Sequence, residues 1–399
     1  MSNHQREYAV HKAPLFTPAF FVVLAFVLVG MGIVTYRYFV GIGPVSNLSN
    51  GYPWGIWLSY DVATGSAIAC GGYVLAITVY VMNRFKYHSM VRSAVLASMF
   101  GYCLAGLSVM VDIGRYWNSY GFFMPSRMNP NSALFEVALC IMAYCVVLIL
   151  EYLPAIWERM SDANKEKSPK IVKFGQVWEK RFDKVLFAIV ALGATLPTMH
   201  QSSLGTLYVL MGNKLSPMWQ TGFLPLLFLS NAYLMGFAIT IFETVLSTKL
   251  LRRPFEKEVI DIMKIVPYVV LFWLVVRIYS VSINGGWSEA FVLRPSSIWF
   301  WLELLLVIIP SIMIMKSSYA KTQSGVFLIG MMLLIGGGMY RIGVYNVGYN
   351  VGPEWNLYFP SIMEFLITLG FIAIEVLGYM VLVKLTPVLP NLANHGHHK

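Results

Sequence analysis

Charged residues are scarce in this sequence. Lys, Arg, Asp and Glu make up 12 % of the 399 residues, whereas globular domains usually carry about 25 %. Hydrophobic residues reach 57 %, and the interior of a soluble protein could not bury so much apolar surface. The composition therefore excludes a soluble multidomain enzyme, a disordered chain and a collagen-like chain. A polytopic membrane protein remains, because lipid can cover the apolar surface.

Cysteine and histidine are also few. The four cysteines all lie in apolar stretches and form no CxxC pair, so we expect small packing residues rather than a disulfide scaffold, an iron–sulfur cluster or a metal site. Only one of the seven histidines, His200, lies inside an apolar run. A transmembrane haem with two axial histidines is therefore excluded, and a His/Met haem is possible but has no support. We expect no haem, so electrons must arrive from another subunit.

Apolar runs of about 20 residues, each long enough to cross the ~30 Å hydrocarbon layer as a helix, recur along the chain. Ten such runs predict ten transmembrane helices, at about 17–36, 54–82, 93–114, 132–157, 185–203, 221–248, 264–283, 297–315, 324–346 and 361–385. The first run is too long for a cleavable signal peptide, so we interpret it as a retained span. The charged connection 158–184 is predicted to be an amphipathic or irregular connector without a separate domain.

The basic residues are distributed unevenly between the two sides of these spans. Of the 29 Lys and Arg residues, 22 lie in one set of connections and tails, five lie in the opposite set, and two lie inside spans. Since basic residues concentrate on the cytoplasmic side, both termini are predicted to be cytoplasmic. The net charge of +10 thus reflects orientation in a bacterial inner membrane, and we expect no nucleic-acid partner.

Ionisable residues inside spans are rare and are functional candidates. With this orientation, Asp61, Asp112, Glu136 and His200 fall at similar depth in the outer half of four successive helices. Neighbouring carboxylates and an imidazole could exchange protons with a lipid-soluble redox carrier. A quinone fits this description. The prediction requires Asp112 and His200 to meet beside one lipid-accessible cavity.

Each of these residues also has a purely structural interpretation. Asp112 could simply pair with Arg115, three positions further along. Glu136 could only complement a helix dipole, and His200 could be a satisfied packing residue. Trp54, above the cluster, could only belong to the interfacial aromatic belt.

Other charged residues lie in the later spans or deeper in the membrane. Arg277, Glu303, Arg341 and Glu364 balance in sign, which favours buried structural ion pairs. Three deeper carboxylates, Glu151, Glu243 and Glu375, could be steps of a proton path from the cytoplasm. For Glu151 and Glu243, placement at the end of a span explains the residue equally well.

Several motifs resemble those of the NrfD/polysulfide-reductase membrane subunits, and among these the membrane subunits of periplasmic nickel–iron uptake hydrogenases. The matching stretches are Pro53-Trp-Gly-Ile-Trp, Ala69-Cys-Gly-Gly, Phe100-Gly-Tyr, Val111-Asp-Ile-Gly-Arg-Tyr-Trp-Asn118, Asn131-Ser-Ala-Leu-Phe-Glu136, Leu196-Pro-Thr-Met-His-Gln-Ser-Ser203 and Gly370-Phe-Ile-Ala-Ile-Glu375. The resemblance runs from about Gly43 to Pro390, and the runs around Asp112 and His200 are its more specific parts.

The resemblance implies an all-α polytopic membrane protein with two four-helix bundles and flanking first and last helices. The expected division is a cytoplasmic tail (1–16), the first span and outer loop (17–53), a first bundle with the quinone site (54–203), a second bundle (204–346), and the last span with a cytoplasmic tail (347–399).

The resemblance also implies a haem-free quinone site formed by Asp112, Glu136 and His200, with Trp54, Asp61 and Arg115 less firmly assigned. Arg115 would orient Asp112. The implied partners are a ferredoxin-like iron–sulfur subunit and the small and large subunits of a nickel–iron hydrogenase on the periplasmic side. Electrons from hydrogen would reach menaquinone (or ubiquinone) here, so the chain would be a non-autonomous quinone-reducing subunit.

Other functions stay open on sequence grounds. Relatives with the same fold serve sulfur, nitrite and molybdopterin oxidoreductase complexes. A secondary transporter would bind a cation at intramembrane acids near the midplane, although the acids here cluster towards the outer side. A passive anchor for a periplasmic enzyme is a third possibility. Proton pumping through the deeper carboxylates is a further hypothesis.

Overall fold

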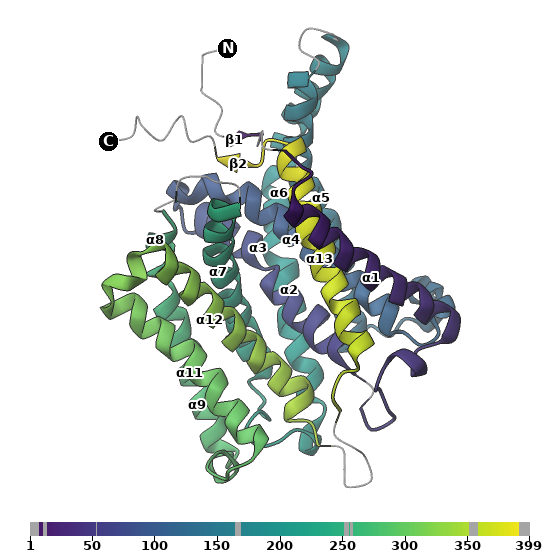
Figure 1. Cartoon of the computed structure of the whole chain (residues 1–399), viewed down its shortest axis with the longest axis vertical. Helices are drawn as coiled ribbons and strands as arrows, with labels where there is room; N and C mark the ends of the chain where they lie inside the picture. Colours follow the sequence, from purple (N-terminus) through teal and green to yellow (C-terminus); the bar gives the residue numbers. More distant parts are fainter. Residues whose placement is uncertain are drawn as a thin grey trace.

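The computed structural model describes residues 8–10, 14–52, 54–163, 169–250, 255, 258–350 and 358–390. This part of the chain is almost entirely helical, as predicted (Figure 1). The α-helices are α1 (Pro18–Val40), α2 (Gly65–Ile68), α3 (Gly71–Ala76), α4 (Val91–Asp112), α5 (Ala133–Ala163), α6 (Pro169–Val209), α7 (Leu224–Leu250), α8 (Glu258–Met263), α9 (Val266–Ile283), α10 (Trp287–Ala290), α11 (Pro295–Lys316), α12 (Gln323–Ile342) and α13 (Ile362–Leu385).

Short π- and 3₁₀-helical segments complete or connect these helices. The π-helical segments are η2 (Trp57–Thr64), η3 (Ile77–Val81) and η9 (Gly343–Val347). The 3₁₀ segments are η1 (Gly43–Val45), η4 (Phe85–Met90), η5 (Tyr116–Phe123), η6 (Pro125–Arg127), η7 (Gly212–Lys214) and η8 (Ser318–Lys321).

Two short strands mark one end of the molecule. β1 (Tyr8–Ala9) pairs antiparallel with β2 (Leu389–Pro390), and both lie above the helical body in Figure 1. We call this end proximal and the opposite end distal. Most of the predicted tails, 1–7, 11–13 and 391–399, lies outside the described residues.

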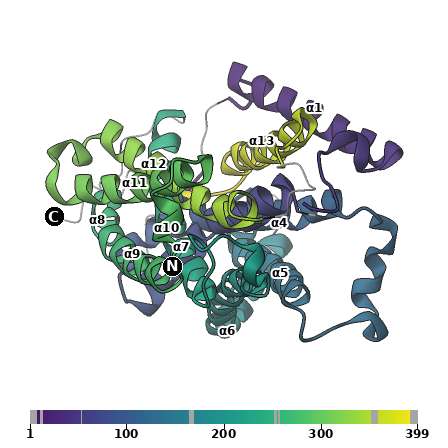
Figure 2. The ribbon, with the colours of Figure 1, turned by 90° about the horizontal axis from the view of Figure 1, so that it is seen from below.

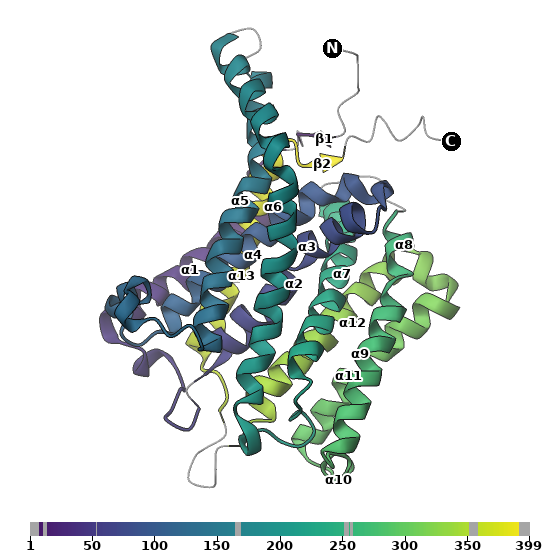
Figure 3. The same ribbon diagram turned by 180° about the vertical axis from the view of Figure 1, so that it is seen from behind.

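Nine helical stretches of the described chain are long and apolar enough to cross a membrane. They are Pro18–Val40, Trp57–Val81, Phe85–Asp112, Ala133–Ser161, Leu224–Lys249, Glu258–Ile283, Pro295–Lys316, Gln323–Val347 and Ile362–Leu385, and each coincides with a predicted span. The chain is therefore a multi-pass membrane protein. The remaining predicted span falls on α6, which packs between α5 and α7 (Figure 3). Its apolar run is interrupted by Pro197, His200 and Gln201, so a total of ten spans stays a prediction.

The helices group into two bundles. In the first bundle, the second span (η2, α2, α3 and η3) contacts α4, α4 contacts α5, and α5 contacts α6, which returns to α3. In the second bundle, α7, α9, α11 and α12 contact one another in a closed ring. The first and last spans form a separate pair, since α1 packs along α13 and α13 packs on α4 (Figure 2). This arrangement matches the predicted architecture of two bundles with flanking first and last helices.

Small residues allow α1 and α13 to approach closely. A Cβ atom on Gly30 would lie only 2.6 Å from the Cα atom of Gly370, so these two glycines bring the helix backbones into contact. Such small-residue contacts are typical of helix pairs in membranes, where close van der Waals packing drives association.

The predicted connector 158–184 is largely helical. The α5 helix continues to Ala163 and α6 begins at Pro169, and the two extend beyond the bundle at the proximal end (Figures 1 and 3). Aromatic contacts hold them together, because the Trp157 ring lies 6.2 Å from that of Trp178 and 5.8 Å from that of Phe182. Of the two predicted forms, amphipathic or irregular, the irregular one is wrong for these described parts, because both are helical.

Candidate functional site

Two carboxylates from different spans lie close enough to interact electrostatically in the distal half of the first bundle. Asp61 lies inside the π-helix η2, is 7 % exposed, and accepts a hydrogen bond of 3.2 Å from the Thr368 hydroxyl on α13. Asp112 is the last residue of α4 and interacts electrostatically with Asp61. Within the described structure, its Oδ1 atom is buried without a hydrogen-bond partner. Because buried polar atoms are nearly always satisfied, this oxygen is suited to a hydrogen bond or a proton exchange with a bound ligand.

Arg37 supplies the positive charge beside Asp112. It lies in the last turn of α1, is fully buried, and interacts electrostatically with Asp112. One guanidinium nitrogen, Nη2, donates to the Ile113 carbonyl at 2.6 Å, and the guanidinium stacks over Tyr38 and Tyr116. Its Nε and Nη1 atoms have no partner among the described residues. Arg37 and Asp112 thus both have buried polar atoms that could form hydrogen bonds with a bound ligand.

Arg37 is missing from the predicted site, because it is one of the five basic residues that the span boundaries assign to the outer connections. The available signal was the continuation of the apolar run to Phe39 and Val40, since α1 ends only at Val40. An arginine inside a span is expensive and marks a partner or a site. Trp57, a buried tryptophan at the start of η2, lies in the same region. Its indole Nε1 has no hydrogen-bond partner among the described residues.

Glu364, also nearby, is fully satisfied and therefore structural. As the N3 residue of a capping box it accepts from the backbone N–H of Ser361 at 2.8 Å, from the backbone N–H of Asn47 at 2.9 Å and from the Tyr358 hydroxyl at 2.6 Å. Burial and the hydrogen bond to Glu364 raise the pKa of Tyr358. Glu364 thus anchors the start of α13, and no ion pair involves it in the described chain.

His200 belongs to a second polar group, formed by α6, α4 and the second span. Its ring is 1 % exposed and lies 5.6 Å from the ring of Tyr102. The Gln201 amide, 3.3 Å from His200 Nδ1, donates to the Ser66 hydroxyl at 3.0 Å and to the Tyr102 hydroxyl at 3.3 Å. His200 Nε2 and Gln201 Oε1 are buried without partners in the described residues.

The two polar groups lie at different depths. Tyr102, which contacts His200, precedes Asp112 by ten residues on the continuous helix α4, a separation of about 15 Å along the axis. The predicted common depth of Asp112 and His200 is therefore not observed. The cause is the length of α6, which continues to Val209 rather than ending near 203 and so places His200 deeper in the bundle.

The other predicted site residues lie apart from both groups. Arg115 is exposed after the end of α4, and no ion pair joins it to Asp112 in the described structure; Arg37 holds that position. Glu136 is half-buried in the first turn of α5 and interacts electrostatically with Cys140 on its own helix. Trp54 accepts a hydrogen bond from Asn346 through its carbonyl and packs 5.9 Å from the Tyr208 ring.

The predicted ion pairs of the later spans are only partly present. Arg277 and Glu303 form a fully buried pair at 2.6 Å, and Glu303 also accepts from the Trp219 indole, which confirms the structural interpretation for these two residues. Arg341 differs, because within the described chain it contacts no acid.

Arg341 instead joins the two bundles. Its guanidinium donates to Asn231 Oδ1 at 2.6 Å and to the Phe228 carbonyl at 2.7 Å, both on α7. Its third bond, at 2.6 Å, reaches the Ala63 carbonyl inside η2. Since a π-helix carries irregular backbone hydrogen bonding and often marks a functional site, Arg341 stabilises the segment that carries Asp61.

Two of the deeper carboxylates are linked to this segment by a series of electrostatic interactions. Glu375 on α13 interacts electrostatically with Glu243 on α7 and with Tyr60, which in turn interacts with Asp61. Glu151 lies apart from them, against α6, where Gly193 leaves room for its side chain: a Cβ there would lie 2.7 Å from Glu151 Oε1. The described residues contain no group of His, Cys, Asp or Glu that could hold a metal ion.

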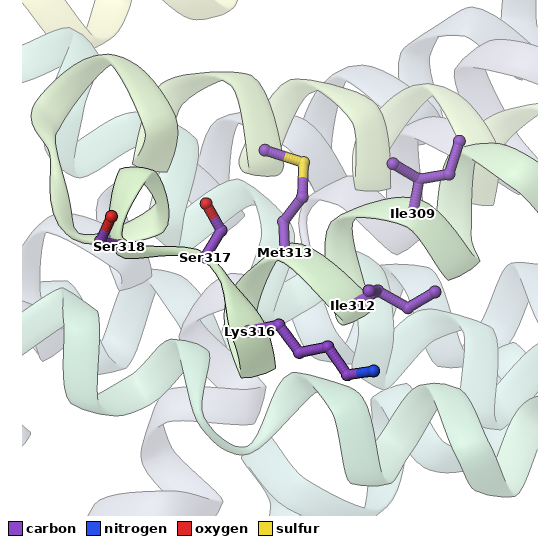
Figure 4. A pocket seen from close by; sticks show the side chains of 6 residues that line it. All are labelled: Ile309, Ile312, Met313, Lys316, Ser317 and Ser318. Carbon is purple, nitrogen blue, oxygen red and sulfur yellow. The ribbon is translucent and has the colours of Figure 1, made fainter.

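A hollow on the surface lies elsewhere. It is lined by Ile309, Ile312, Met313, Lys316, Ser317 and Ser318 (Figure 4). These residues belong to the last turns of α11 and the start of η8, in the second bundle. The hollow contains none of the predicted site residues, so it does not mark the candidate site.

Comparisons with known proteins find a family model and several relatives. The family model described as "Polysulphide reductase, NrfD" matches residues 44–352. A protein of Escherichia coli K12 named "Probable Ni/Fe-hydrogenase 2 b-type cytochrome subunit" is 39% identical over 377 residues, which cover 94% of this chain and 93% of the relative.

Two further relatives match about half of the chain. The "Menaquinone reductase, integral membrane subunit" of Nitratidesulfovibrio vulgaris is 33% identical over 193 residues, 47% of this chain and 43% of the relative. A selenate reductase subunit of Mesobacillus selenatarsenatis is 22% identical over 186 residues, 46% of this chain and 39% of the relative.

The name of the Escherichia coli relative raises the question of a b-type haem. Such a haem is commonly held by two axial histidines that face each other. The described histidines are His200, in the middle of the first bundle, and His88, in η4 at the proximal end, where the Tyr8 hydroxyl contacts it. They do not form an axial pair, so we derive no step through a haem.

Proposed function

The chain belongs to the polysulphide reductase NrfD family, and on this premise we propose that it is the quinone-reactive membrane subunit of a respiratory nickel–iron hydrogenase complex. It would reside in the bacterial inner membrane with both termini cytoplasmic, so that the distal end faces the periplasm. Iron–sulfur partner subunits on that side would deliver electrons, and menaquinone would receive them. The chain would work only as part of the complex.

The unsatisfied polar atoms around Asp112 are the observation that supports this proposal most directly. Asp112 Oδ1 can exchange a proton, whereas Arg37 Nε and Nη1 can donate hydrogen bonds, and all three are buried without a partner in the described structure. A quinone head group complements them, because it is apolar across its ring and carries two carbonyl oxygens that accept hydrogen bonds. The site lies next to α1, an apolar helix of membrane-spanning length with more than half of its residues exposed, so a lipid-soluble substrate can approach it.

The reaction requires two electrons and two protons for each quinone reduced to quinol. The electrons come from the partner subunits. We assign Asp112 as the immediate proton donor, with Asp61 replenishing it, since the two carboxylates interact electrostatically. Arg37 takes the orienting role that was predicted for Arg115, and it would also stabilise negative charge on a partly reduced quinone.

His200 cannot serve the same head group as Asp112. The two oxygens of one quinone ring cannot bridge a depth difference of about 15 Å between residues on adjacent helices. We therefore assign His200, with its unpartnered Nε2 in the described structure, to an inner polar group that exchanges protons through water. Glu136 would line the approach to the site, with Trp54 at its distal edge.

A proton route from the cytoplasm would follow the linked carboxylates. Glu243, Glu375, Tyr60 and Asp61 interact in that order, and their helices run from the proximal to the distal half. Glu151 would contribute from the α5–α6 side of the bundle. Proton translocation coupled to quinone reduction would use this route.

A different partner complex is the second candidate. The relative named as part of a selenate reductase favours a membrane subunit of another oxidoreductase complex, with the same quinone site and a different catalytic partner. Copurification from the native membrane would separate the two. Recovery of nickel–iron hydrogenase subunits with the chain supports the first candidate, and recovery of a molybdopterin-containing reductase instead overturns it.

Turnover of the purified complex tests the function itself. We expect hydrogen to drive reduction of a menaquinone analogue, and we expect this activity to be lost when the chain is removed while hydrogen oxidation by an artificial dye continues. Quinone reduction that persists without the chain would contradict the proposal.

A further inference from the structure

The segment between α4 and α5 has an unusual surface. We call residues 116–128, which comprise η5 and η6, the aromatic shelf. Its exposed apolar side chains, with their exposed fractions, are Trp117 (61 %), Tyr120 (49 %), Phe123 (68 %), Met124 (40 %) and Met128 (36 %). Contiguous exposed apolar side chains of this size mark an interaction surface.

The shelf is folded and fixed to the membrane-spanning helices. The Tyr116 ring lies 4.6 Å from that of Tyr38 on α1, and the Phe122 ring lies 5.0 Å from that of Phe135 on α5. The Arg127 guanidinium lies over Tyr120. The exposed aromatic side chains are thus held outward by a packed segment.

The position of the shelf points to a lipid surface. It lies beside the distal end of α1 and projects sideways from the bundle, as the blue segment at the right of Figures 1 and 2 shows. The neighbouring helix α1 packs along α13 on one side, and more than half of its residues are exposed. A segment that projects sideways at the end of a lipid-facing helix lies where the bilayer meets water.

The chemistry of the shelf agrees with that position. From Ile113 to Phe135 the sequence contains two arginines, Arg115 and Arg127, and no acidic residue. Aromatic side chains together with arginine favour the interface, where apolar rings enter the acyl boundary and cations contact lipid phosphates. A partner protein with an acidic surface could also contact Arg115 and Arg127. It would not account for the large aromatic side chains, which project sideways from the bundle.

We propose that the aromatic shelf is a membrane-interface anchor that lies in the headgroup layer of the distal leaflet, with Trp117 and Phe123 inserted towards the acyl chains. This inference is independent of the proposed redox function, since it concerns only where the segment lies. Tyr116 fixes the shelf beside Arg37, whose guanidinium lies over the Tyr116 ring and donates to the Ile113 carbonyl.

Site-directed spin labelling measures the depth of the shelf. A nitroxide would be attached to the Phe123→Cys variant and to the Lys214→Cys variant, whose exposed site lies in the distal turn η7. Both proteins would be reconstituted in phospholipid nanodiscs, and the signal of the labelled unmodified protein would be subtracted. We expect the label at 123 to collide more with lipid-soluble oxygen than with a water-soluble nickel chelate, and the label at 214 to show the reverse.

The same measurement on the complete complex tests the alternative that a partner protein covers the shelf. A label at 123 that collides mainly with the aqueous chelate, like the label at 214, would overturn the proposal. Loss of access to both reagents when the partner subunits are bound would also overturn it, because a protein would then cover the shelf.

A second measurement avoids the introduced cysteine. The fluorescence of the unmodified protein minus that of Trp117→Phe isolates Trp117. We expect lipids brominated near the glycerol end of the acyl chain to quench this difference signal more strongly than lipids brominated near the methyl end. No quenching by either lipid would contradict insertion.

Discussion

Replacing Asp112 with asparagine tests the proposed proton donor. Asparagine keeps the size of the side chain but cannot deliver a proton at neutral pH. Positioned general acids contribute about 10²- to 10⁴-fold to a rate, and each tenfold step corresponds to about 1.36 kcal/mol of activation free energy. We therefore expect Asp112→Asn to slow hydrogen-dependent quinone reduction by about 10²- to 10⁴-fold, an increase of roughly 3–5 kcal/mol in the barrier.

The structure also predicts what Asp112→Asn leaves unchanged. Asp112 Oδ1 makes no hydrogen bond with the described residues, so the substitution breaks no hydrogen bond at that oxygen. It does remove the carboxylate beside the buried Arg37, so we expect a loss in the free energy of unfolding that is smaller than the roughly 3–5 kcal/mol of a broken buried ion pair. Hydrogen oxidation with a dye acceptor should stay unchanged, since that reaction does not need the quinone site.

Arg115→Gln provides the matched control. Arg115 is exposed and forms no ion pair with Asp112 in the described chain, so quinone reduction should be unaffected by its loss. The assay compares initial rates of quinone reduction and of dye reduction for the same preparations. Normal quinone reduction in Asp112→Asn would refute the assignment of the proton donor, and a large loss in Arg115→Gln would restore the orienting role that was predicted for Arg115.

Three further substitutions test the supporting structure. Arg341→Met leaves two buried carbonyls and the Asn231 side-chain oxygen without their hydrogen bonds, at a cost of roughly 1–3 kcal/mol for each group. Thermal unfolding in detergent should therefore occur at a clearly lower temperature. An unchanged melting curve would contradict the role of Arg341 in joining the bundles. Arg277→Met should lower the free energy of unfolding by about 3–5 kcal/mol, because it leaves the buried Glu303 carboxylate without its ion-pair partner. Adding Glu303→Leu should recover most of that loss. A double variant as unstable as the single one would contradict this. Glu375→Gln should slow quinone reduction on the order of tenfold, less than Asp112→Asn, because it removes a relay group rather than the direct donor; equal rates for Glu375→Gln and the unmodified complex would exclude the route.

The spans were predictable because the hydrophobic pattern directly reflects the thickness of the bilayer. Nine predicted spans coincide with apolar helices of the described chain. The balance of charges inside the later spans predicted buried ion pairs, and one of them, Arg277 with Glu303, is observed. Hydropathy fails where a helix continues past its apolar part. The α6 helix extends to Val209, about 9 Å beyond the predicted end at 203, and this placed His200 at the wrong depth.

The partners of buried charges could not be obtained from sequence distance. Asp112 was expected to pair with Arg115 because they are three residues apart, but α4 ends at Asp112 and the helical geometry that would join them ends there too. Arg37, 75 positions away, lies beside Asp112 only because α1, α4 and α13 pack together. Likewise, the bond from Arg341 to the Ala63 carbonyl depends on how the bundles meet.

Photoaffinity labelling tests the location of the quinone site most directly. A menaquinone analogue with a photoactivatable group on its ring would be irradiated in the membrane-embedded complex, and the labelled peptides would be identified by mass spectrometry, with excess unmodified quinone as competitor. We predict competed labelling near Arg37, around Asp112 and at the start of α13. Competed labelling confined to the segment around His200, or to the second bundle, would contradict the assigned location.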